Sequence, residues 1–325
     1  MKTDASLARL EGLAPVHDDE LAGEAETPAA LALLDRIVAT PLPHARRTPR
    51  RRVRLAVPAL AVAVAAVALA VTISGGSHGA EPAAAATLRK AASVARKQPQ
   101  MIPGPGQYLY TKSVDAYMAT TVPGGVGTEY SVLVPHVREV WLGPDGGRLY
   151  ETSGKASFLS ARDRARWIAS GSPSLTEHAS ETPLDPTKPL DLPSDPDTLY
   201  ADLRNAAKGH GSSLDGEMFT LVGDSLRETS ATPEQRAALY QVAARIPGVE
   251  LLGSVKDSAG RTGIAVARED GGIRSTLIFD PQTSALLSEE DVALPGNSFG
   301  YPAGTRIGYA TYLEQAVVNS DTAVP

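Results

Sequence analysis

The chain contains no cysteine among its 325 residues. This absence excludes disulfide bonds, thiolate metal sites, cysteine nucleophiles and attachment of lipid through a cysteine. Any folded domain must therefore be stabilised by its core alone. The absence is compatible with an oxidising compartment but does not by itself indicate one.

Paired histidines are also lacking. A helical metal site needs two histidines three or four residues apart, so that both rings lie on one face. No two of the six histidines have that spacing: His17, His44, His78, His136, His178 and His210. We therefore expect no metal ion and no other cofactor.

A complete hydrolytic site is lacking too. Residues 223–226 read Gly-Asp-Ser-Leu, the nucleophile block of one esterase family. In that family a histidine base follows the serine, whereas here the last histidine, His210, precedes Ser225. We expect this segment to be a helix with Leu221, Val222 and Leu226 facing the core.

Three adjacent carboxylates, Glu289, Glu290 and Asp291, are a second candidate for chemistry. Neighbouring side chains on a strand point to opposite faces, so the run does not favour an acid/base pair. The sequence instead predicts a solvated strand edge that discourages aggregation between sheets. We expect no enzymatic activity.

One run of the chain has no charge at all. Six arginines, Arg46, Arg47, Arg50, Arg51, Arg52 and Arg54, precede nineteen uncharged residues, Leu55 to Ile73. At ~1.5 Å per residue this run spans roughly 28 Å as a helix, close to the ~30 Å hydrocarbon thickness of a bilayer. We expect a transmembrane helix; a cleaved signal peptide and a buried core helix are the alternatives.

The arginines fix the expected orientation, because basic residues remain on the cytoplasmic side. We expect a cytoplasmic tail (1–53), a transmembrane helix (54–74), a juxtamembrane helix and linker (75–105) and an extracytoplasmic domain (106–325). The protein is then a single-pass cell-membrane protein with the lipid bilayer as one partner. The formal net charge of −6 argues against nucleic acid as another.

The tail contains one amphipathic segment. Thr27 and Pro28 start a predicted helix that ends before Pro41, and one face carries Leu31, Leu34, Ile37 and Val38. An isolated helix of about twelve residues is marginal in water. The segment therefore either docks on a cytoplasmic partner or remains an unformed stub that sets topology.

The part outside the membrane predicts an α+β fold. Strands are expected at 106–115, 128–143 and 147–154, and then helices at 160–171, 194–209 and 232–248, with 172–196 as loop. A meander follows at 249–256, 262–269, 273–280, 284–294 and 306–318. A further helix at 83–98 precedes them. This order indicates a curved antiparallel sheet with helices packed on one face.

Aromatic residues gather in the first β region, among them Tyr108, Tyr110, Tyr130, Trp141 and Tyr150. Packing within the core or on a sheet face explains such a group. The alternative is that they line a site for a lipid or another apolar ligand in the concavity of the sheet.

Several segments carry a resemblance: "LLDRIVATP", "LPSDPDTLYADLR", "ATPEQRAALYQVAARIPGVE", "AGRTGIAVARED", "STLIFDPQTSALLSEE" and "GTRIGYATYLEQAVV". The chain resembles an actinobacterial family of single-pass membrane proteins often encoded beside extracytoplasmic-function sigma factors. The resemblance implies a membrane-bound partner of a transcription regulator, with an exterior domain similar in plan to lipoprotein-carrier and anti-sigma-partner domains. The zinc motif of known anti-sigma modules needs cysteine and is excluded.

Two functions follow as expectations. The first is an extracytoplasmic sensing or binding domain with an anti-sigma-like or signalling role, in which the tail contacts a sigma-factor-related protein. The second is a membrane-tethered binding module for a lipid or another apolar ligand.

Overall fold

A computed structural model describes residues 79–125, 127–176, 178–186, 192–227 and 231–325. The predicted tail, arginine cluster and transmembrane helix (1–53 and 54–74) lie outside these residues. So does the predicted tail helix with its apolar face. Among the described helices, none is long and apolar enough to cross a membrane.

The described helices are α3 (Pro82–Ala95), α4 (Ala161–Ala169), α5 (Pro196–Ala206), α6 (Leu214–Leu226) and α7 (Pro233–Ala243). The strands of the first half are β1 (Tyr108–Thr121), β2 (Tyr130–Leu133), β3 (His136–Gly143), β4 (Gly146–Ser153), β5 (Ser157–Phe158) and β6 (Ser180–Leu184). Those of the second half are β7 (Val249–Lys256), β8 (Thr262–Asp270), β9 (Ile273–Phe279), β10 (Leu286–Ala293) and β11 (Arg306–Val318).

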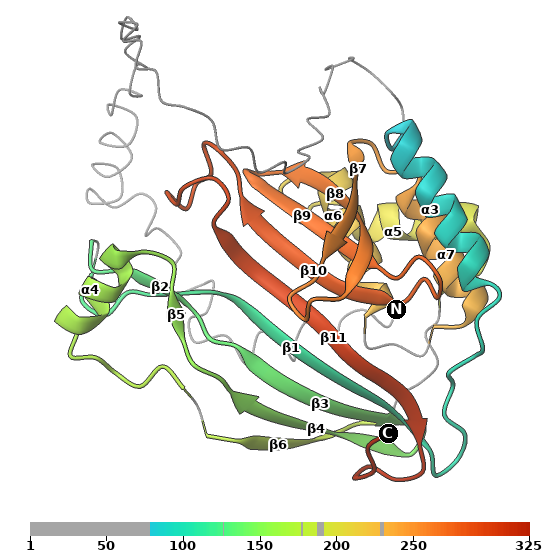
Figure 1. The fold of residues 1–325 in the computed structure, drawn as a ribbon, viewed down its shortest axis with the longest axis horizontal. Helices are drawn as coiled ribbons and strands as arrows, with labels where there is room; N and C mark the ends of the chain where they lie inside the picture. The colour runs from blue at the N-terminus through green and yellow to red at the C-terminus, as the bar shows by residue number, and fades with distance from the viewer. Residues whose placement is uncertain (1–78, 126, 177, 187–191, 228–230) are drawn as a thin grey trace, which may run out of the picture. The chain divides into compact units, whose positions relative to one another are not determined.

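All eleven described strands form one antiparallel sheet, with the order β6-β4-β3-β1-β11-β10-β9-β8-β7 (Figure 1). Two short strands are off this path, since β2 pairs with both β1 and β5. The long strands β1 and β11 pair from Tyr108↔Val318 to Tyr117↔Gly308. This pairing joins the first strands of the domain to the last ones. The predicted α+β class with an antiparallel sheet is confirmed.

Local signals explain where the helices begin. At α7 the Thr232 side chain accepts a hydrogen bond from the backbone of Gln235, and the Gln235 side chain accepts one from the backbone of Thr232. This is the capping box that the sequence predicts, and it satisfies two otherwise unpaired donors. Asp195 caps α5 in the same way by accepting from the backbone of Thr198.

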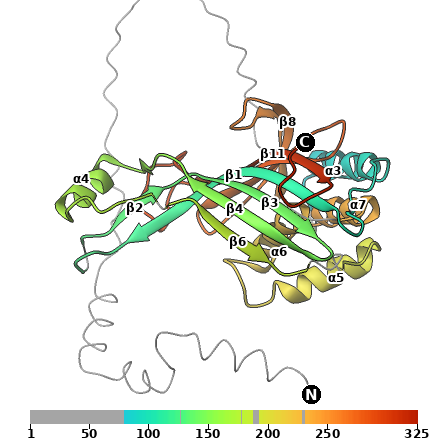
Figure 2. The same cartoon turned by 90° about the horizontal axis from the view of Figure 1, so that it is seen from below.

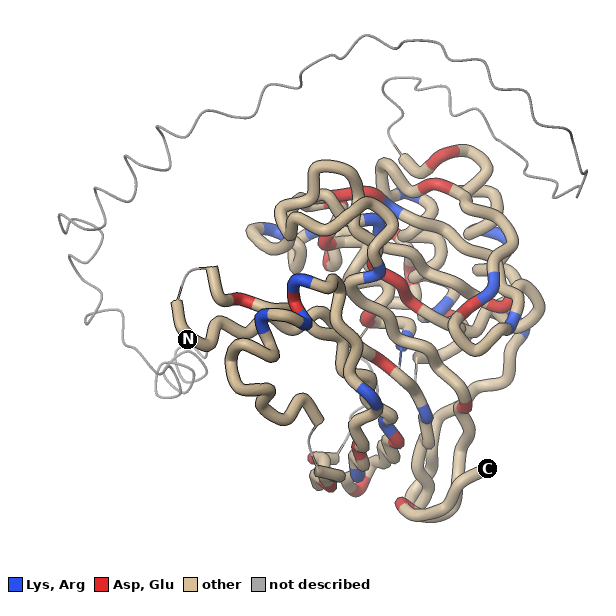
Figure 3. The backbone as a smooth tube through the Cα atoms, turned by 60° about the vertical axis from the view of Figure 1, so that its left-hand side comes forward, with Lys and Arg blue, Asp and Glu red and all other residues tan. Residues whose placement is uncertain are grey.

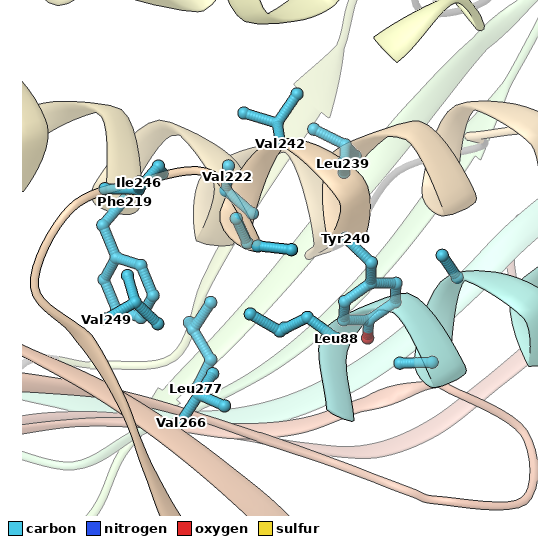
Figure 4. Packing of buried hydrophobic residues seen from close by; sticks show 14 of the residues in the cluster. Leu88, Phe219, Val222, Leu239, Tyr240, Val242, Ile246, Val249, Val266 and Leu277 are labelled. Atoms are coloured by element: carbon cyan, nitrogen blue, oxygen red, sulfur yellow. The ribbon is translucent and has the colours of Figure 1, made fainter. Parts of the chain in front are cut away.

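Helices α3, α5, α6 and α7 share one hydrophobic core with the strands β7, β8 and β9 (Figure 4). The figure shows side chains of α3, α6 and α7 above side chains of the sheet, including Leu88, Phe219, Val222, Leu239, Tyr240, Val266 and Leu277. The predicted stripe of α3 is buried, with Leu88 and Ala95 each at 0% exposure. The helix is therefore part of the domain core.

Helix α4 lies apart from the other helices, beside β2 and β5 (Figures 1 and 2). Asp163 of α4 is buried and accepts hydrogen bonds at Oδ1 from the Ser131 backbone, at 3.0 Å, and from the Tyr301 hydroxyl, at 3.1 Å. Helix α4 is thereby attached to β2 and to the loop before β11.

Two expectations about strands are wrong. The predicted strand at 128–143 is divided into β2 and β3, because Pro135 lies between them and cannot donate a ladder hydrogen bond. The segment predicted as loop contains β6, which pairs with β4 at the sheet edge. The pairing Gly147↔Leu184 involves distant residues, which a local pattern does not reveal.

The expectation of a solvated strand edge at Glu289, Glu290 and Asp291 is also wrong. These residues belong to β10, which lies inside the sheet between β9 and β11. Glu289 pairs with Leu277 on one side and with Ala310 on the other. Because alternate residues share a face, Glu289 and Asp291 lie together on the face that carries the helices.

Candidate functional site

Four of the five predicted aromatic residues lie together. The rings of Tyr110 and Trp141 have centroids 5.1 Å apart, and Tyr108 and Tyr150 pack against them. Tyr130 is buried elsewhere, in β2, which pairs with the last residues of β1.

This aromatic cluster lies on the sheet face opposite the helices. The pairs Leu277↔Glu289, Glu289↔Ala310 and Ala310↔Asp115 trace the helix-bearing face as far as β1. Tyr110 is five residues before Asp115, so its side chain points the other way. The Trp141 indole nitrogen donates to the carbonyl of Ala323 at 2.7 Å, and Ala323 packs against the cluster. The C-terminal segment therefore covers part of it.

The esterase-like segment is helical, as predicted. Ser225 lies in α6, and its hydroxyl donates to the Leu221 carbonyl at 2.7 Å. Val222 and Leu226 are buried in the core. Within the described part of the chain, no group of three histidine, aspartate or glutamate residues is arranged to hold a metal ion.

A cavity of about 310 Å³ lies between the helices and the sheet. It is lined by the segment after α3, by the first turn of α7 and the end of α6, and by four parts of the sheet. These parts are Thr111 of β1, the turn between β7 and β8, the start of β10 with the turn leading into it, and the middle of β11. Because so many segments meet there, only the folded domain assembles this cavity.

The wall of this cavity combines apolar and basic groups. Its apolar lining comes from Pro99, Met101, Leu226, Leu286, Leu287 and Leu313. Three arginines, Arg227, Arg236 and Arg261, also line it, against one carboxylate, Glu314, which is exposed. Figure 3 shows that basic and acidic positions are interspersed along the described backbone.

Two of the three arginines have carboxylate partners. The Arg261 guanidinium lies 2.7 Å from Oδ2 of the buried Asp257 and also donates to the Leu287 carbonyl. Arg227 lies 3.3 Å from Glu289. Their charges are compensated within the protein.

Arg236 differs from them. The residue is 8% exposed, and among the described residues its guanidinium makes no ion pair. Its Nε atom is buried without a hydrogen-bond partner among those residues. Burial lowers the pKa of Arg236, and the charge of Tyr240 opposes this shift. An arginine nevertheless remains charged at neutral pH, so this cavity contains a buried positive charge that has no ion-pair partner among the described residues.

One wall of the cavity is held by a buried hydrogen bond. The Tyr240 hydroxyl donates to the Ser284 carbonyl at 2.6 Å, and both residues are almost fully buried. Ser284 has a φ of 59°, a left-handed conformation that non-glycine residues rarely adopt. The hydrogen bond fixes the turn that leads into β10.

A second cavity, of about 230 Å³, adjoins the first, since Arg227 lines both. The Tyr312 hydroxyl donates to Glu289 at 2.7 Å. Burial, together with the Glu289 charge, raises the pKa of Tyr312 strongly. Glu289 therefore accepts a hydrogen bond from Tyr312 and also lies against Arg227.

The Asp291 side chain lines the same cavity. Burial raises the pKa of its carboxyl, while a hydrogen bond from Ser275 at 2.7 Å and the charge of Arg227 oppose the shift. Tyr117 also lines this cavity, and burial raises its pKa to about 12. These groups form a polar network next to the basic cavity.

Sequence reasoning did not identify either cavity. Arg236 is inside a strongly helical segment, where an arginine is ordinarily a solvated residue. One signal was present: Arg236 lies one position before Ala237 and three before Leu239, both on the buried side of α7. The facing wall comes from β10 and β11, whose position relative to α7 no local pattern gives.

Comparison of the chain with models of known protein families, with curated proteins and with solved structures finds no match.

Proposed function

We propose that this protein is a single-pass membrane protein whose extracytoplasmic domain binds a small ligand and whose cytoplasmic tail transmits that state to a regulatory partner. The cavity of about 310 Å³ between the helices and the sheet is the observation that carries the proposal. Cavities of roughly 300–1,000 Å³ with a mainly apolar lining and a few polar groups are typical ligand sites.

The membrane part of the proposal rests on the arginine cluster and on the nineteen uncharged residues that follow it. The regulatory part rests on the apolar face of the predicted tail helix and on the resemblance to proteins encoded beside sigma factors. A sigma-factor-related cytoplasmic protein is the partner proposed for the tail.

The second candidate is a tethered binding module without a signalling tail. It shares the cavity with the first proposal and differs only in what the tail does. The mixed apolar and basic lining favours an amphiphilic ligand for both. The aromatic cluster is less suited to bind that ligand, because Ala323 already packs against it.

Occupation of the cavity is tested by filling it. Ala285 lines the cavity, so Ala285→Trp places an indole inside it. Leu252→Trp is the matched control, since Leu252 is 41% exposed on the edge strand β7. Full-length wild type and both variants are purified from membranes in a mild detergent, and native mass spectrometry records the small molecules that remain bound.

We expect wild type and Leu252→Trp to retain the same bound small molecule and Ala285→Trp to lose it. Retention by all three proteins would show that the ligand binds elsewhere. Absence of any bound molecule, with no ligand found when cell extract is added back, would contradict a binding function.

A further inference from the structure

We propose that the ligand is a small amphiphilic anion, whose negative group pairs with Arg236 and whose apolar part packs on the leucines of the cavity. This inference rests on the proposed function, because it identifies the chemical class of ligand for the same cavity.

The charge of Arg236 is the first argument. A buried arginine normally pairs with a carboxylate, because moving an unpaired charge out of water is costly. Arg236 is about nine-tenths buried, has an unsatisfied Nε and makes no ion pair with a described residue. Its side chain lines the cavity, so a ligand there can supply the missing negative charge.

The surrounding groups support an anion rather than a cation. Arg227 and Arg261 also face the cavity, and their own partners hold them in place. Glu314, the one carboxylate of the lining, is exposed and makes no ion pair with Arg236. A cationic ligand would meet the charge of Arg236 without a compensating carboxylate from the described lining, whereas an anion would pair with it.

The apolar lining supports an amphiphile rather than a free inorganic anion. Leucines from α6, β10 and β11 contribute to the same wall as Arg236, together with Met101. Apolar surface of this kind favours a ligand that has hydrocarbon as well as charge. A short carboxylic acid or the end of an acidic lipid has both parts.

Three probes separate these features. Hexanoate carries charge and hydrocarbon, hexanamide has nearly the same shape without the charge, and inorganic phosphate has charge without hydrocarbon. The thermal midpoint of the full-length protein in mild detergent is measured with each probe at millimolar concentration. A ligand that binds only the folded state raises this midpoint as its concentration rises.

Two variants test the role of Arg236. Arg236→Met keeps the length and apolar stem of the side chain but removes its charge. Arg236→Lys keeps the charge but loses the planar donors that match a carboxylate. We expect hexanoate alone to stabilise wild type, and we expect Arg236→Met to bind it about 10- to 100-fold more weakly, the usual effect of losing a charged hydrogen bond.

The stability of the variants without ligand provides an independent readout. Removing an uncompensated buried charge relieves its desolvation, so Arg236→Met should unfold at the same temperature as wild type or at a higher one. An Arg236→Met protein that unfolds earlier or fails to fold would show that the guanidinium is satisfied by the protein itself. That result would overturn the proposal.

Other results of the probe experiment would also overturn parts of the proposal. Equal stabilisation by hexanoate and hexanamide, or stabilisation of Arg236→Met as strong as that of wild type, would overturn the role of the charge. Stabilisation by phosphate alone would overturn the amphiphile. In each case a bound molecule that Ala285→Trp displaces would still support ligand binding by the cavity, which keeps the two proposals distinguishable.

Discussion

Tyr240 connects the stability of the domain to the shape of the cavity. Its hydroxyl donates to the Ser284 carbonyl at 2.6 Å, and its ring lies 5.3 Å from that of Phe279. The substitution Tyr240→Phe removes one oxygen and leaves the ring in place. The Ser284 carbonyl then loses this hydrogen bond in a position where the residue is 1% exposed.

The expected cost follows from that burial. A hydrogen bond contributes about 1 kcal/mol net, and a buried acceptor left unsatisfied costs about 1–3 kcal/mol. We therefore expect Tyr240→Phe to lower the free energy of unfolding by about 2 kcal/mol. For a domain of this size, the thermal midpoint should fall by about 4–8 °C.

The assay is thermal unfolding of the full-length protein, followed by the fluorescence of its two tryptophans. Tyr200→Phe is the matched control, because the Tyr200 hydroxyl makes no hydrogen bond to a described residue and its ring stacks under Arg245. This control should change stability by less than about 0.5 kcal/mol. Equal midpoints for the two variants would refute the reasoning.

Because Ser284 lines the cavity, Tyr240→Phe should also weaken ligand binding.

Three further predictions concern other parts of the chain. Burial raises the pKa of Asp291, so the folded state binds its proton more tightly than the unfolded state does. Binding of this proton therefore stabilises the folded state. The full contribution to the free energy of unfolding is present below the unfolded pKa of about 3.9, and it is lost as the pH rises through the higher folded pKa. Asp291→Asn should therefore be more stable than wild type at pH 7, and this difference in stability should disappear near pH 3. Thermal unfolding of both proteins across this pH range measures the difference, and a difference that stays constant with pH would contradict the prediction. Leu34→Asp places a charge on the apolar face of the predicted tail helix and should abolish co-purification of cytoplasmic partners without changing membrane insertion; recovery of the same partners would leave the tail as a topology stub. Ser225→Ala should leave any ester turnover unchanged, because no histidine follows Ser225 in the chain; turnover by wild type alone would disprove this.

The helices could be predicted because their signals are local. Thr232 and Gln235 specify the start of α7 by their spacing, and Pro247-Gly248 follows its end. Likewise, Asp195 and Pro196 start α5, and Leu199 and Leu203 are buried as their spacing indicates. Capping and periodicity act within a few residues, so the sequence shows them directly.

The candidate site could not be predicted, because it depends on distant contacts. Glu289 and Asp291 read as an exposed edge when the order of strands is unknown. Pairing of β10 with both β9 and β11 places them inside the sheet, next to Arg227. The sequence likewise does not show that Arg236 makes no ion pair with a described residue, because this depends on which carboxylates lie near it after folding.

Photo-crosslinking tests the central claim most directly. A hexanoate that carries a diazirine at its far end is bound to the full-length protein in native membranes, activated with light and mapped by peptide mass spectrometry. We predict labels within 98–101, 283–287 or 312–315, the segments that line the cavity, and we predict that these labels disappear in Arg236→Met and in Ala285→Trp. Labels concentrated instead at the aromatic cluster of Tyr110 and Trp141, or unchanged in both variants, would contradict the assignment of the ligand site.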